Sequence, residues 1–526
     1  MNIYSYDDIP YPSYIFKQTQ PDKLATLATL FHRQPMAVAH CRVLEIGCAS
    51  GNNLIAMALA SPEGQFVGVD LSECQIKVGQ ASIQAIGLKN ITLHRQNILE
   101  IDADLGIFDY IIAHGVFSWV PYEVQEKLLH ICHANLAPNG VAFISYNAYP
   151  GWHSQGMIRQ MMLYHTQQLT DSKEKVEQSR AFLQFLVEAT KEQEDFYSLS
   201  LRTRLEQLKQ LPDNYLYHEY LEENNAPTFF YQFIERAERY NLRYLADSNV
   251  GMMFNESLPP QAQEVIASLQ NQVQREQYMD FLRNRAFRQT LLCHKDIPIN
   301  YTLQANTVAK FYIAAAVLKP TDADDEQFLS NTQTSVDFFN RQGKKILSTH
   351  SSIYKAVLVC LSDVWPQFLT FGQLMQNVLT RLGHFSLPPK QLPNFIGEVQ
   401  MLLLQLYLGG VAEFSLQPPQ FTLTVSERPV AYPLARLQAQ QGYKTIANTC
   451  SDTIPLKPLA LKMLPWLDGQ HDIAVLVEKI LAAVASGEMT MTSQAIITDT
   501  AILRQQLASD VKTILQELGR SCFLIS

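Results

Sequence analysis

The sequence predicts an α/β fold in which helices cover a doubly wound parallel sheet. Two observations support this prediction. From residue 41 onward, short β-type apolar runs alternate with segments in which apolar residues recur three and four positions apart. The first of these runs leads directly into a glycine-containing turn and then into a stretch of small and apolar residues, which is the order strand, turn, helix.

Seven apolar runs are expected to form strands. The first five are Cys41–Ile46, Phe66–Asp70, Ile91–Arg95, Tyr110–His114 and Val141–Tyr146. The last two strands of a seven-stranded sheet are expected at Leu242–Ser248 and Phe287–His294. Helices are expected between the strands, for example over residues 72–87 and 121–136, because apolar residues lie at helical spacing there.

Residues 151–225 interrupt this alternation. They are rich in Gln, Glu and Lys and keep helical periodicity, which indicates a helical insertion that could serve as a dimer or substrate surface. The sheet domain is therefore expected to comprise residues 1–150 and 226–300. Because the chain exceeds the usual domain size of roughly 100 to 200 residues, further domains are expected at 301–430 and 431–526.

The part of the chain after residue 300 is expected to contain winged-helix-like α+β domains. Residues 301–345, with the acidic run Asp322–Glu326, are interpreted as a connector. Residues 350–425 show three helical patterns followed by GGVAEF and FTLTV, which are expected to pair as a hairpin, and residues 455–526 repeat the theme weakly. The predicted helices carry few cations, which favours packing against protein over binding of DNA.

Composition excludes several classes of function. The chain has 41 basic and 50 acidic residues and a formal charge of −9, which disfavours broad nucleic-acid binding because phosphate contacts need clustered cations. The sequence shows neither a signal-peptide pattern nor an apolar run of about 18 residues, so a cytoplasmic protein without membrane insertion is expected. The eight cysteines are scattered, and no metal site is expected.

The turn after the first strand is the strongest functional signal. It reads Glu45-Ile-Gly-Cys-Ala-Ser-Gly-Asn-Asn53, and its glycines, Gly47 and Gly51, let backbone N–H groups and a helix N-terminus approach an anion. A dinucleotide fingerprint would need glycines at positions 47, 49 and 52, whereas the chain has Ala49 and Asn52. A nicotinamide cofactor is therefore disfavoured, and the expected anion is a carboxylate.

Three further positions fit a nucleoside that carries a free amino acid. Glu45 can accept hydrogen bonds from an ammonium group, and Asp70, at the end of the second strand, can accept them from ribose hydroxyls. Asn97 and Ile98 follow the third strand, where an amide can meet the adenine edge and an apolar side chain its face. Two alternatives stay open: Asp70 could cap the helix that begins near Ser72, and Asn97 could be an ordinary loop residue.

Four segments together resemble class I S-adenosylmethionine-dependent methyltransferases: VLEIGCASGNNL, FVGVDLS, FDYIIAHGVFSWVP and NGVAFISYNAYPGW. More narrowly, they resemble the bacterial family with a methyltransferase regulatory domain, which includes dimeric lysine methyltransferases of outer-membrane proteins. The segments YPSYIFKQTQPDKLATLATLF and ERPVAYPLARLQA are similar to that family too. Ala49 stands where many such enzymes have glycine, and Asn97 stands where Asp is commoner.

The resemblance implies a Rossmann-like methyltransferase sheet, S-adenosylmethionine as cofactor, protein lysine as acceptor, a regulatory role for residues 301–430 and a homodimer. The cofactor-binding residues that follow from it and from the motif are Glu45, Gly47, Cys48, Gly51, Asn52, Asp70, Leu71, Asn97, Ile98 and His114.

On the acceptor side, aromatic residues gather near predicted strand ends, where ligands bind in open α/β sheets. Rings there suit the positive charge that builds on a methylated nitrogen. The expected pocket residues are Tyr14, His114, Trp119, Tyr146 and Tyr149, with Tyr11, Phe117 and Trp152 nearby. His114 is either a base or a partner of a loop carbonyl. The segment after the fourth strand reads His-Gly-Val-Phe and not Asn-Pro-Pro-Tyr, which disfavours amide and adenine substrates.

Three functions remain open at this point. The first is methylation of protein lysine, which is favoured because so much of the chain lies outside the sheet domain. The second is methylation of a small or lipid-like molecule, with the later domains serving assembly or regulation. The third is a catalytically inactive binding protein that kept the fold.

Overall fold

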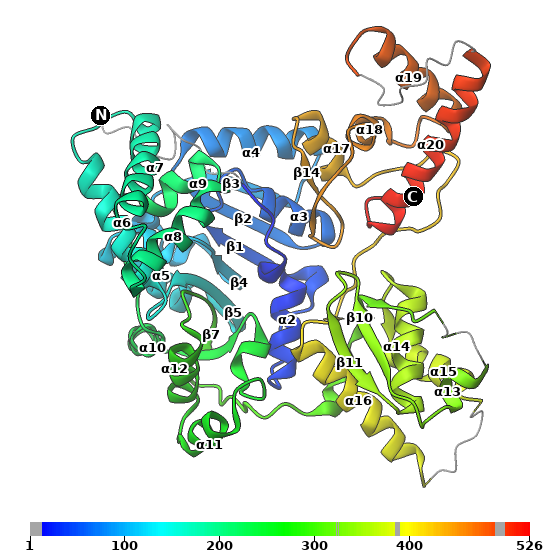
Figure 1. Cartoon of the computed structure of the whole chain (residues 1–526), viewed down its shortest axis with the longest axis horizontal. Coiled ribbons are helices and arrows are strands. Elements are labelled where there is room, and N and C mark those ends of the chain that lie inside the picture. The colour runs from blue at the N-terminus through cyan, green and yellow to red at the C-terminus, as the bar shows by residue number, and fades with distance from the viewer. Residues whose placement is uncertain (1–12, 322, 324–325, 384–389, 490–499) are drawn as a thin grey trace.

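The computed structural model describes residues 13–321, 323, 326–383, 390–489 and 500–526. Its largest element is a seven-stranded sheet with the order β3-β2-β1-β4-β5-β7-β6 (Figure 1). The strands are β1 Arg42–Ile46, β2 Gln65–Asp70, β3 Ile91–Arg95, β4 Phe108–Ala113, β5 Leu136–Asn147, β6 Leu242–Asp247 and β7 Phe287–His294. Strands β1 to β5 are parallel, and β7 runs antiparallel to β5 and β6. The predicted seven-stranded α/β fold is confirmed, but the sheet is mixed and not wholly parallel because β7 runs antiparallel.

Helices lie between the strands, as the sequence predicts, and a further helix, α2, precedes the first strand. They are α2 Pro21–Leu30, α3 Asn52–Ala60, α4 Glu73–Ile86, α5 Tyr122–Ala134, α10 Phe230–Arg239, α11 Pro260–Ser268 and α12 Gln272–Arg283. The local sequence explains their bounds. In α4, the Ser72 hydroxyl accepts a hydrogen bond from the Gln75 N–H at 3.2 Å, and Gly87 ends the helix with a φ of 82°.

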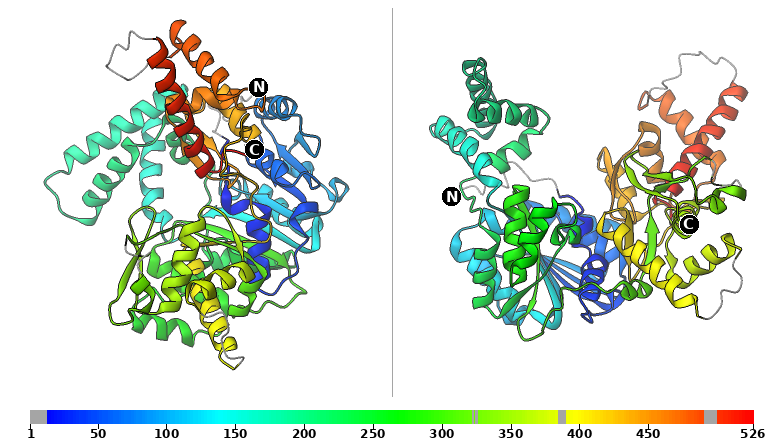
Figure 2. Two further views of the ribbon diagram at one scale, coloured as in Figure 1. Left: turned by 90° about the vertical axis from the view of Figure 1, so that its right-hand side faces the viewer. Right: turned by 60° about the horizontal axis from the view of Figure 1, so that its bottom comes forward.

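The segment that interrupts the alternation is helical, as expected. It contains α6 Trp152–Thr166, α7 Ser172–Ala189, α8 Phe196–Lys209 and α9 Asp213–Tyr220. These helices have a hydrophobic cluster of their own, which includes Leu183, Leu201 and Leu216, and they project away from the sheet (Figure 2). An independent small core explains how the insertion leaves the sheet undisturbed.

The later part of the chain differs from the sequence-based expectation in two respects. The predicted connector, residues 301–345, contains η7 Ala305–Lys310, β8 Tyr312–Ala315, β9 Val317–Leu318 and β10 Val336–Asn340, and β11 Lys345–Thr349 begins at its last residue. The expected hairpin of GGVAEF and FTLTV is wrong, because β13 Ala412–Ser415 pairs with β8 across about 100 residues. Pro418 and Pro419 follow β13 and lack the N–H groups that a hairpin strand would need. The segment FTLTV instead contacts the end of the chain, where the Thr422 N–H donates to Leu524 O at 2.8 Å.

The remaining elements of this part are α13 Glu326–Ser330, α14 Ser352–Val364, β12 Leu369–Thr370, α15 Phe371–Arg381, α16 Leu392–Leu408, α17 Pro433–Gln440, β14 Thr445–Ala447, β15 Thr453–Pro455, α18 Pro458–Met463, α19 Ile473–Ala485 and α20 Thr500–Arg520. In the acidic run, positions 322, 324 and 325 lie outside the described residues. Along the described ranges we find no helix with both the length and the apolar character needed to span a membrane.

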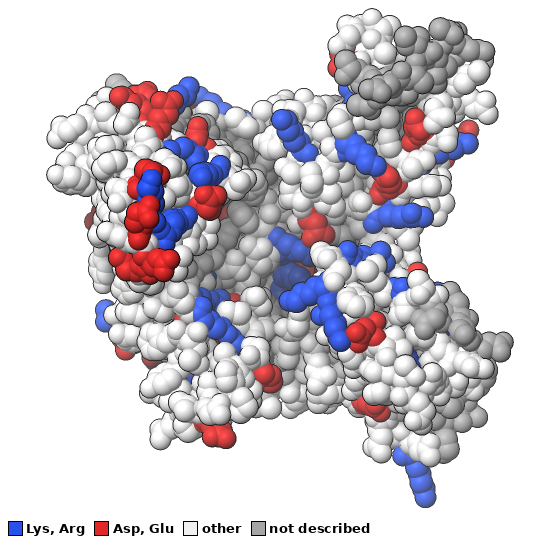
Figure 3. Space-filling model, viewed as in Figure 1, with Lys and Arg blue, Asp and Glu red and all other residues white. Residues whose placement is uncertain are grey.

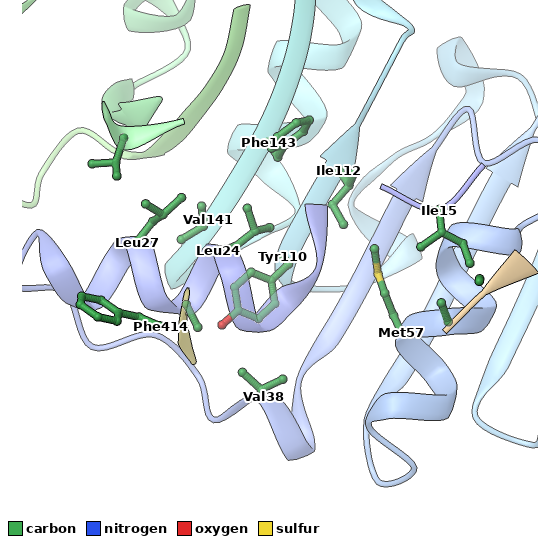
Figure 4. Packing of buried hydrophobic residues seen from close by; sticks show 14 of the residues in the cluster. Ile15, Leu24, Leu27, Val38, Met57, Tyr110, Ile112, Val141, Phe143 and Phe414 are labelled. Atoms are coloured by element: carbon green, nitrogen blue, oxygen red, sulfur yellow. The ribbon is translucent and has the colours of Figure 1, made fainter. Parts of the chain in front are cut away.

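Helix α2 joins the sheet to the later part of the chain. Leu24 and Leu27 are buried against the sheet, close to Tyr110 and Val141, and Phe414 of β13 packs on the same helix (Figure 4). The Asp22 carboxylate accepts the N–H groups of residues 416 and 417, both at 2.8 Å. One continuous core therefore extends from the sheet into the later part.

An ion pair reinforces this junction. Lys17 Nζ lies 2.9 Å from Glu413 Oε1 and 3.0 Å from Asp452 Oδ1, so one cation binds carboxylates from two later segments. Figure 3 shows basic and acidic side chains together in the hollow between the sheet and the later part. The start of the described chain is thereby fixed to residues about 400 positions away.

A second charge cluster is fully buried between β7 and α12. Arg288 Nε donates to Asp280 Oδ2 at 2.7 Å, and its Nη1 donates to Glu276 Oε2 at 2.9 Å. The Tyr244 hydroxyl also donates to Glu276, at 2.7 Å. These mutual bonds compensate the cost of burying the charges.

Replacing Arg288 by Met is expected to leave buried Glu276 without a cation and Asp280 with only Arg285 Nη1, at 3.8 Å. Unfolding followed by circular dichroism should show a loss of about 3 to 5 kcal/mol for the sheet domain. The matched control is Lys295→Met, because Lys295 makes only an exposed ion pair with Glu238 at 3.3 Å and should change stability by less than about 0.5 kcal/mol. Equal unfolding midpoints for the two variants would contradict the structural role of Arg288.

Candidate functional site

The turn between β1 and α3 has a backbone that few residues other than glycine adopt. Gly47 and Gly51 both have a φ of 73°, and Ala49 between them has a φ of 49°. The Gly47 N–H donates to Val69 O at 2.8 Å, and a Cβ at Gly47 would lie 2.4 Å from Val116 Cγ2. Cys48 is buried in this turn, and burial raises the pKa of its thiol. The turn is a tight cradle in which the main chain can approach a ligand.

The carboxylate of Asp70 links this turn to the next one. Its Oδ2 accepts the Ala49 N–H at 2.8 Å, and its Oδ1 accepts the Ser72 N–H at 2.9 Å. The alternative in which Asp70 stabilises the start of α4 is therefore partly realised, with Ser72 as the N-cap. Each carboxylate oxygen has two acceptor sites, so a single oxygen can accept more than one hydrogen bond. The neighbouring Leu71 is 40% exposed and offers an apolar surface.

Glu45 is buried beneath the same turn. Its Oε1 accepts a hydrogen bond from Asn53 Nδ2 at 2.7 Å. Its Oε2 is also buried, and no described residue bonds it. Burial, the largest effect, together with the Asp70 carboxylate outweighs the Asn53 hydrogen bond and raises the pKa of Glu45 to about 7. An ammonium group next to Oε2 would both satisfy this oxygen and favour the carboxylate.

Residues 13–20, here called the N-terminal strap, cross the start of α3. Asn52 Nδ2 donates to Ser13 O at 2.9 Å, and the Asn52 N–H donates to Ser13 Oγ at 3.2 Å. The predicted site residue Asn52 therefore holds the strap on the turn. Tyr14, on the strap, is 42% exposed near this edge, and Tyr11 lies outside the described residues.

Asn97 and Ile98 follow β3 at the same edge of the sheet. Asn97 Oδ1 accepts the Leu99 N–H at 3.0 Å and caps the turn η3, Ile98–Glu100. The alternative of a loop-capping Asn is thus realised for its oxygen. Ile98 is half-buried beside it and presents an apolar side chain.

His114 follows β4 and is enclosed by rings. Its ring centroid lies 4.0 Å from that of Phe16, 5.7 Å from that of Phe143 and 6.1 Å from that of Phe287. Burial lowers the pKa of His114 to about 4, so the ring is neutral at physiological pH. Its Nδ1 has no hydrogen-bond partner within the described ranges.

The other expected pocket residues are not all brought together. Trp119 lies with its ring centroid 6.3 Å from that of Trp152, and the Tyr149 ring stacks on His153 at 4.1 Å. Tyr146 is instead a core residue, because its hydroxyl lies 3.0 Å from Thr290 Oγ1 and its ring stacks on Phe233. Phe143 reaches His114, and side chains alternate along a strand, so Tyr146 points to the opposite face of the sheet.

Sequence reasoning missed two residues that the structure brings to this edge. Asn53 touches Glu45 and the strap, and Phe16 covers His114. The second Asn of the turn was visible in the sequence, but no local signal connects Phe16 to a strand almost 100 residues away. A search of the described positions finds no cluster of three His, Cys, Asp or Glu side chains that could hold a metal ion.

Comparison with family models identifies three regions of the chain. Residues 37–211 match a family described as a methyltransferase domain, residues 212–294 a "Predicted methyltransferase regulatory domain", and residues 427–523 the "PKMT, C-terminal winged helix domain". The structure of PKMT2 from Rickettsia typhi is 32% identical, with a TM-score of 0.88 over 98% of this chain and 100% of that one. The chain belongs to the PKMT family of methyltransferases.

Two further similarities support this membership. The structure of PKMT2 from Rickettsia typhi in complex with AdoHcy has a TM-score of 0.87 and 32% identity, with coverage of 98% of this chain and 100% of that one. An uncharacterized protein of Rickettsia prowazekii (strain Madrid E) is 36% identical over 524 residues, which is 99% of this chain and 93% of that protein. The resemblance seen in the sequence is confirmed.

This PKMT-family chain is a methyltransferase that uses S-adenosylmethionine. The residues at the edge of the sheet fit that cofactor. The cradle at Gly47 leaves no room for a side chain, and the buried Glu45 Oε2 has no described partner, as a site for a cationic amino group requires. The expected fold and cofactor are thereby confirmed.

Changing Gly47 to Ala is expected to lower the affinity for S-adenosylhomocysteine by about tenfold or more, since a loss of about 1.4 kcal/mol already has that effect. The added methyl group needs an unfavourable φ and collides with Val116. Calorimetric titration measures the change. Gly87→Ala is the control, because Gly87 also has a positive φ but its Cβ would meet nothing within 4 Å. Unchanged affinity in the Gly47 variant would remove this turn from the cofactor site.

Proposed function

We propose that this PKMT-family methyltransferase transfers methyl groups to lysine side chains of proteins. The observation that carries the proposal is the likeness to PKMT2 along the whole chain, including the helical insertion and the later domains. A likeness confined to the sheet would support a methyltransferase of any substrate class.

In the proposed cofactor site, Glu45 binds the amino group, while Gly47, Cys48, Gly51 and Asn52 surround the amino-acid part. Leu71 and Asp70 contact the ribose, and Asn97 with Ile98 contacts the adenine. This assignment is supported by the position of all these residues at one edge of the sheet, around β1, β2 and β3.

In the proposed acceptor site, His114 lies on the border between cofactor and lysine. Bound S-adenosylmethionine supplies a methyl group on a positively charged sulfur, which reacts with an amine without covalent help from the protein. His114, neutral because of its low pKa, can accept an N–H of the lysine amine through Nδ1 and orient the nitrogen lone pair. Phe16 and Phe143 exclude water around it and disfavour the ammonium form of the lysine.

The aromatic residues Tyr14, Trp119 and Tyr149 complete the proposed acceptor side. Their rings favour the positive charge that forms on the nitrogen as the methyl group arrives. Tyr146 acts from the core, where it supports the end of β5 through Thr290.

The rest of the chain has proposed roles as well. The proposed sheet domain comprises residues 1–150 and 226–300. The insertion, residues 151–225, forms a homodimer or substrate surface. Two separate domains follow, at residues 301–430 and 431–526. Exposed apolar side chains on the insertion, such as Phe185 and Phe196, support a surface that a partner covers. The eight cysteines are free thiols, which supports a cytoplasmic location.

The test of the lysine proposal is methyl transfer from radiolabelled S-adenosylmethionine into a fractionated lysate. We expect label in the protein fraction and, by mass spectrometry of digests, mass increments of whole methyl groups on lysine. Label only in the low-molecular-weight or lipid fraction would overturn the proposal, and no label in any fraction, together with no cofactor binding, would indicate an inactive protein.

Replacing Asp70 by Ala is expected to lower both this transfer and the affinity for S-adenosylhomocysteine. Loss of hydrogen bonds to a charged group costs about 1.5 to 3 kcal/mol, or about 10- to 150-fold in affinity. The control is Asp104→Ala, an exposed carboxylate away from the turn, which should bind like the wild type. An Asp70 variant that binds equally well would contradict its role at the ribose.

A further inference from the structure

Asn53 makes four hydrogen bonds that use its whole amide group. Its Nδ2 donates to Glu45 Oε1 at 2.7 Å and to Thr19 Oγ1 at 2.9 Å. Its Oδ1 accepts the Phe16 N–H at 2.9 Å and Gln20 Nε2 at 3.1 Å. An amide offers two donors and one acceptor oxygen with two lone pairs, so Asn53 has no unused hydrogen-bonding capacity.

The direction in which this amide points is fixed by its partners. The Phe16 N–H can only donate, so it must face the Asn53 oxygen. The Thr19 hydroxyl donates its hydrogen to Phe16 O at 2.8 Å and must therefore accept from the Asn53 nitrogen. A reversed amide would put donor against donor on the strap side and acceptor against acceptor at Glu45.

We infer that Asn53 is a positioning residue for cofactor recognition: it holds one oxygen of Glu45 so that the other oxygen is available, as a carboxylate, to the amino group of S-adenosylmethionine. This inference rests on the proposed role of Glu45. Asn53, a residue of α3 that is oriented by the N-terminal strap, determines whether Glu45 can bind the amino group.

The groups around Glu45 explain why its hydrogen bond from Asn53 matters for its ionisation. Asp70, at the end of β2, and the Cys48 thiol are the titratable groups that face Glu45 from the neighbouring elements. Burial and the negative charge of Asp70 raise the pKa of Glu45, and the Asn53 hydrogen bond lowers it. Among the described residues, Asn53 is thus the group whose hydrogen bond favours the charged carboxylate of Glu45 before the cofactor binds.

The affinity for the cofactor is expected to depend on pH through the ionisation of Glu45. Binding of the amino group needs ionised Glu45, so affinity is expected to fall as the pH decreases through about 7. Without the Asn53 donor, the pKa of Glu45 rises, and the loss of affinity moves to higher pH. A rise of about one unit lowers the ionised fraction at pH 7 about fivefold, and raising the pH restores it.

The experiment is calorimetric titration of S-adenosylhomocysteine between pH 6 and 8.5 into the full chain and three variants. Asn53→Ala is expected to bind about fivefold more weakly at pH 7 and to approach the wild type at pH 8.5. Glu45→Gln should lack the pH dependence, and adding Asn53→Ala to it should cause little further loss. The control is Asn90→Ala, which removes two hydrogen bonds from the opposite end of α3, to Ala58 O and Ser61 O, and should keep the wild-type pH profile.

The outcomes separate this inference from the proposed function. If the wild type does not bind at any pH, the proposed cofactor site fails. If the wild type binds and Asn53→Ala shows the same affinity and pH profile, Glu45 does not depend on Asn53 and the inference is wrong. A uniform loss at all pH values, shared with Asn90→Ala, would mean that Asn53 only stabilises α3, and it would equally overturn the inference.

Discussion

The burial of α2 between the sheet and β13 is the contact on which the arrangement of the whole chain depends. The helix exposes almost none of its apolar side chains, because Leu24 and Leu27 face the sheet while Asp22 and the preceding Lys17 bind the later part of the chain. The strap that precedes the helix reaches Asn52, Asn53 and His114. The same short segment therefore belongs to the core, to the interdomain junction and to the edge proposed to bind the cofactor.

Polar groups are satisfied differently at the two charged centres of the sheet domain. Around Arg288, each charge has a partner and the cluster acts as part of the core. At the cofactor edge, Glu45 Oε2 and His114 Nδ1 are buried without a described partner. A buried polar atom without a partner is unfavourable in the free protein, so a ligand that hydrogen-bonds to either of these two atoms is favoured at this edge.

The sequence was sufficient to predict those elements that depend on residues close together in the chain. The apolar runs predicted all seven strands. The glycines of the first turn predicted a cradle, because the positive φ at positions 47 and 51 favours glycine over other residues. Contacts between segments that are distant in the sequence produce no comparable local sequence pattern. The pairing of β8 with β13 and the approach of Phe16 to His114 depend on how the chain closes in space. Tyr146 is expected in the pocket because its position near the end of a strand is readable from the sequence. The face toward which its side chain points is not readable, and the structure buries this side chain beside Thr290.

The junction between Lys17, Glu413 and Asp452 also bears on how the protein is made. The partners of the strap and α2 are synthesised about 400 residues later, which corresponds to roughly 20 to 80 seconds at about 5 to 20 residues per second. Strand β7, which lies between β5 and β6, also becomes available long after β5 has left the ribosome. Until β13 is made, Asp22 and the side of α2 that packs on Phe414 lack their final partners, and until β7 is made one edge of β5 is unpaired. The junction between the N-terminal strap and the later part of the chain is thus completed late in biosynthesis, only after Asp452 has been made.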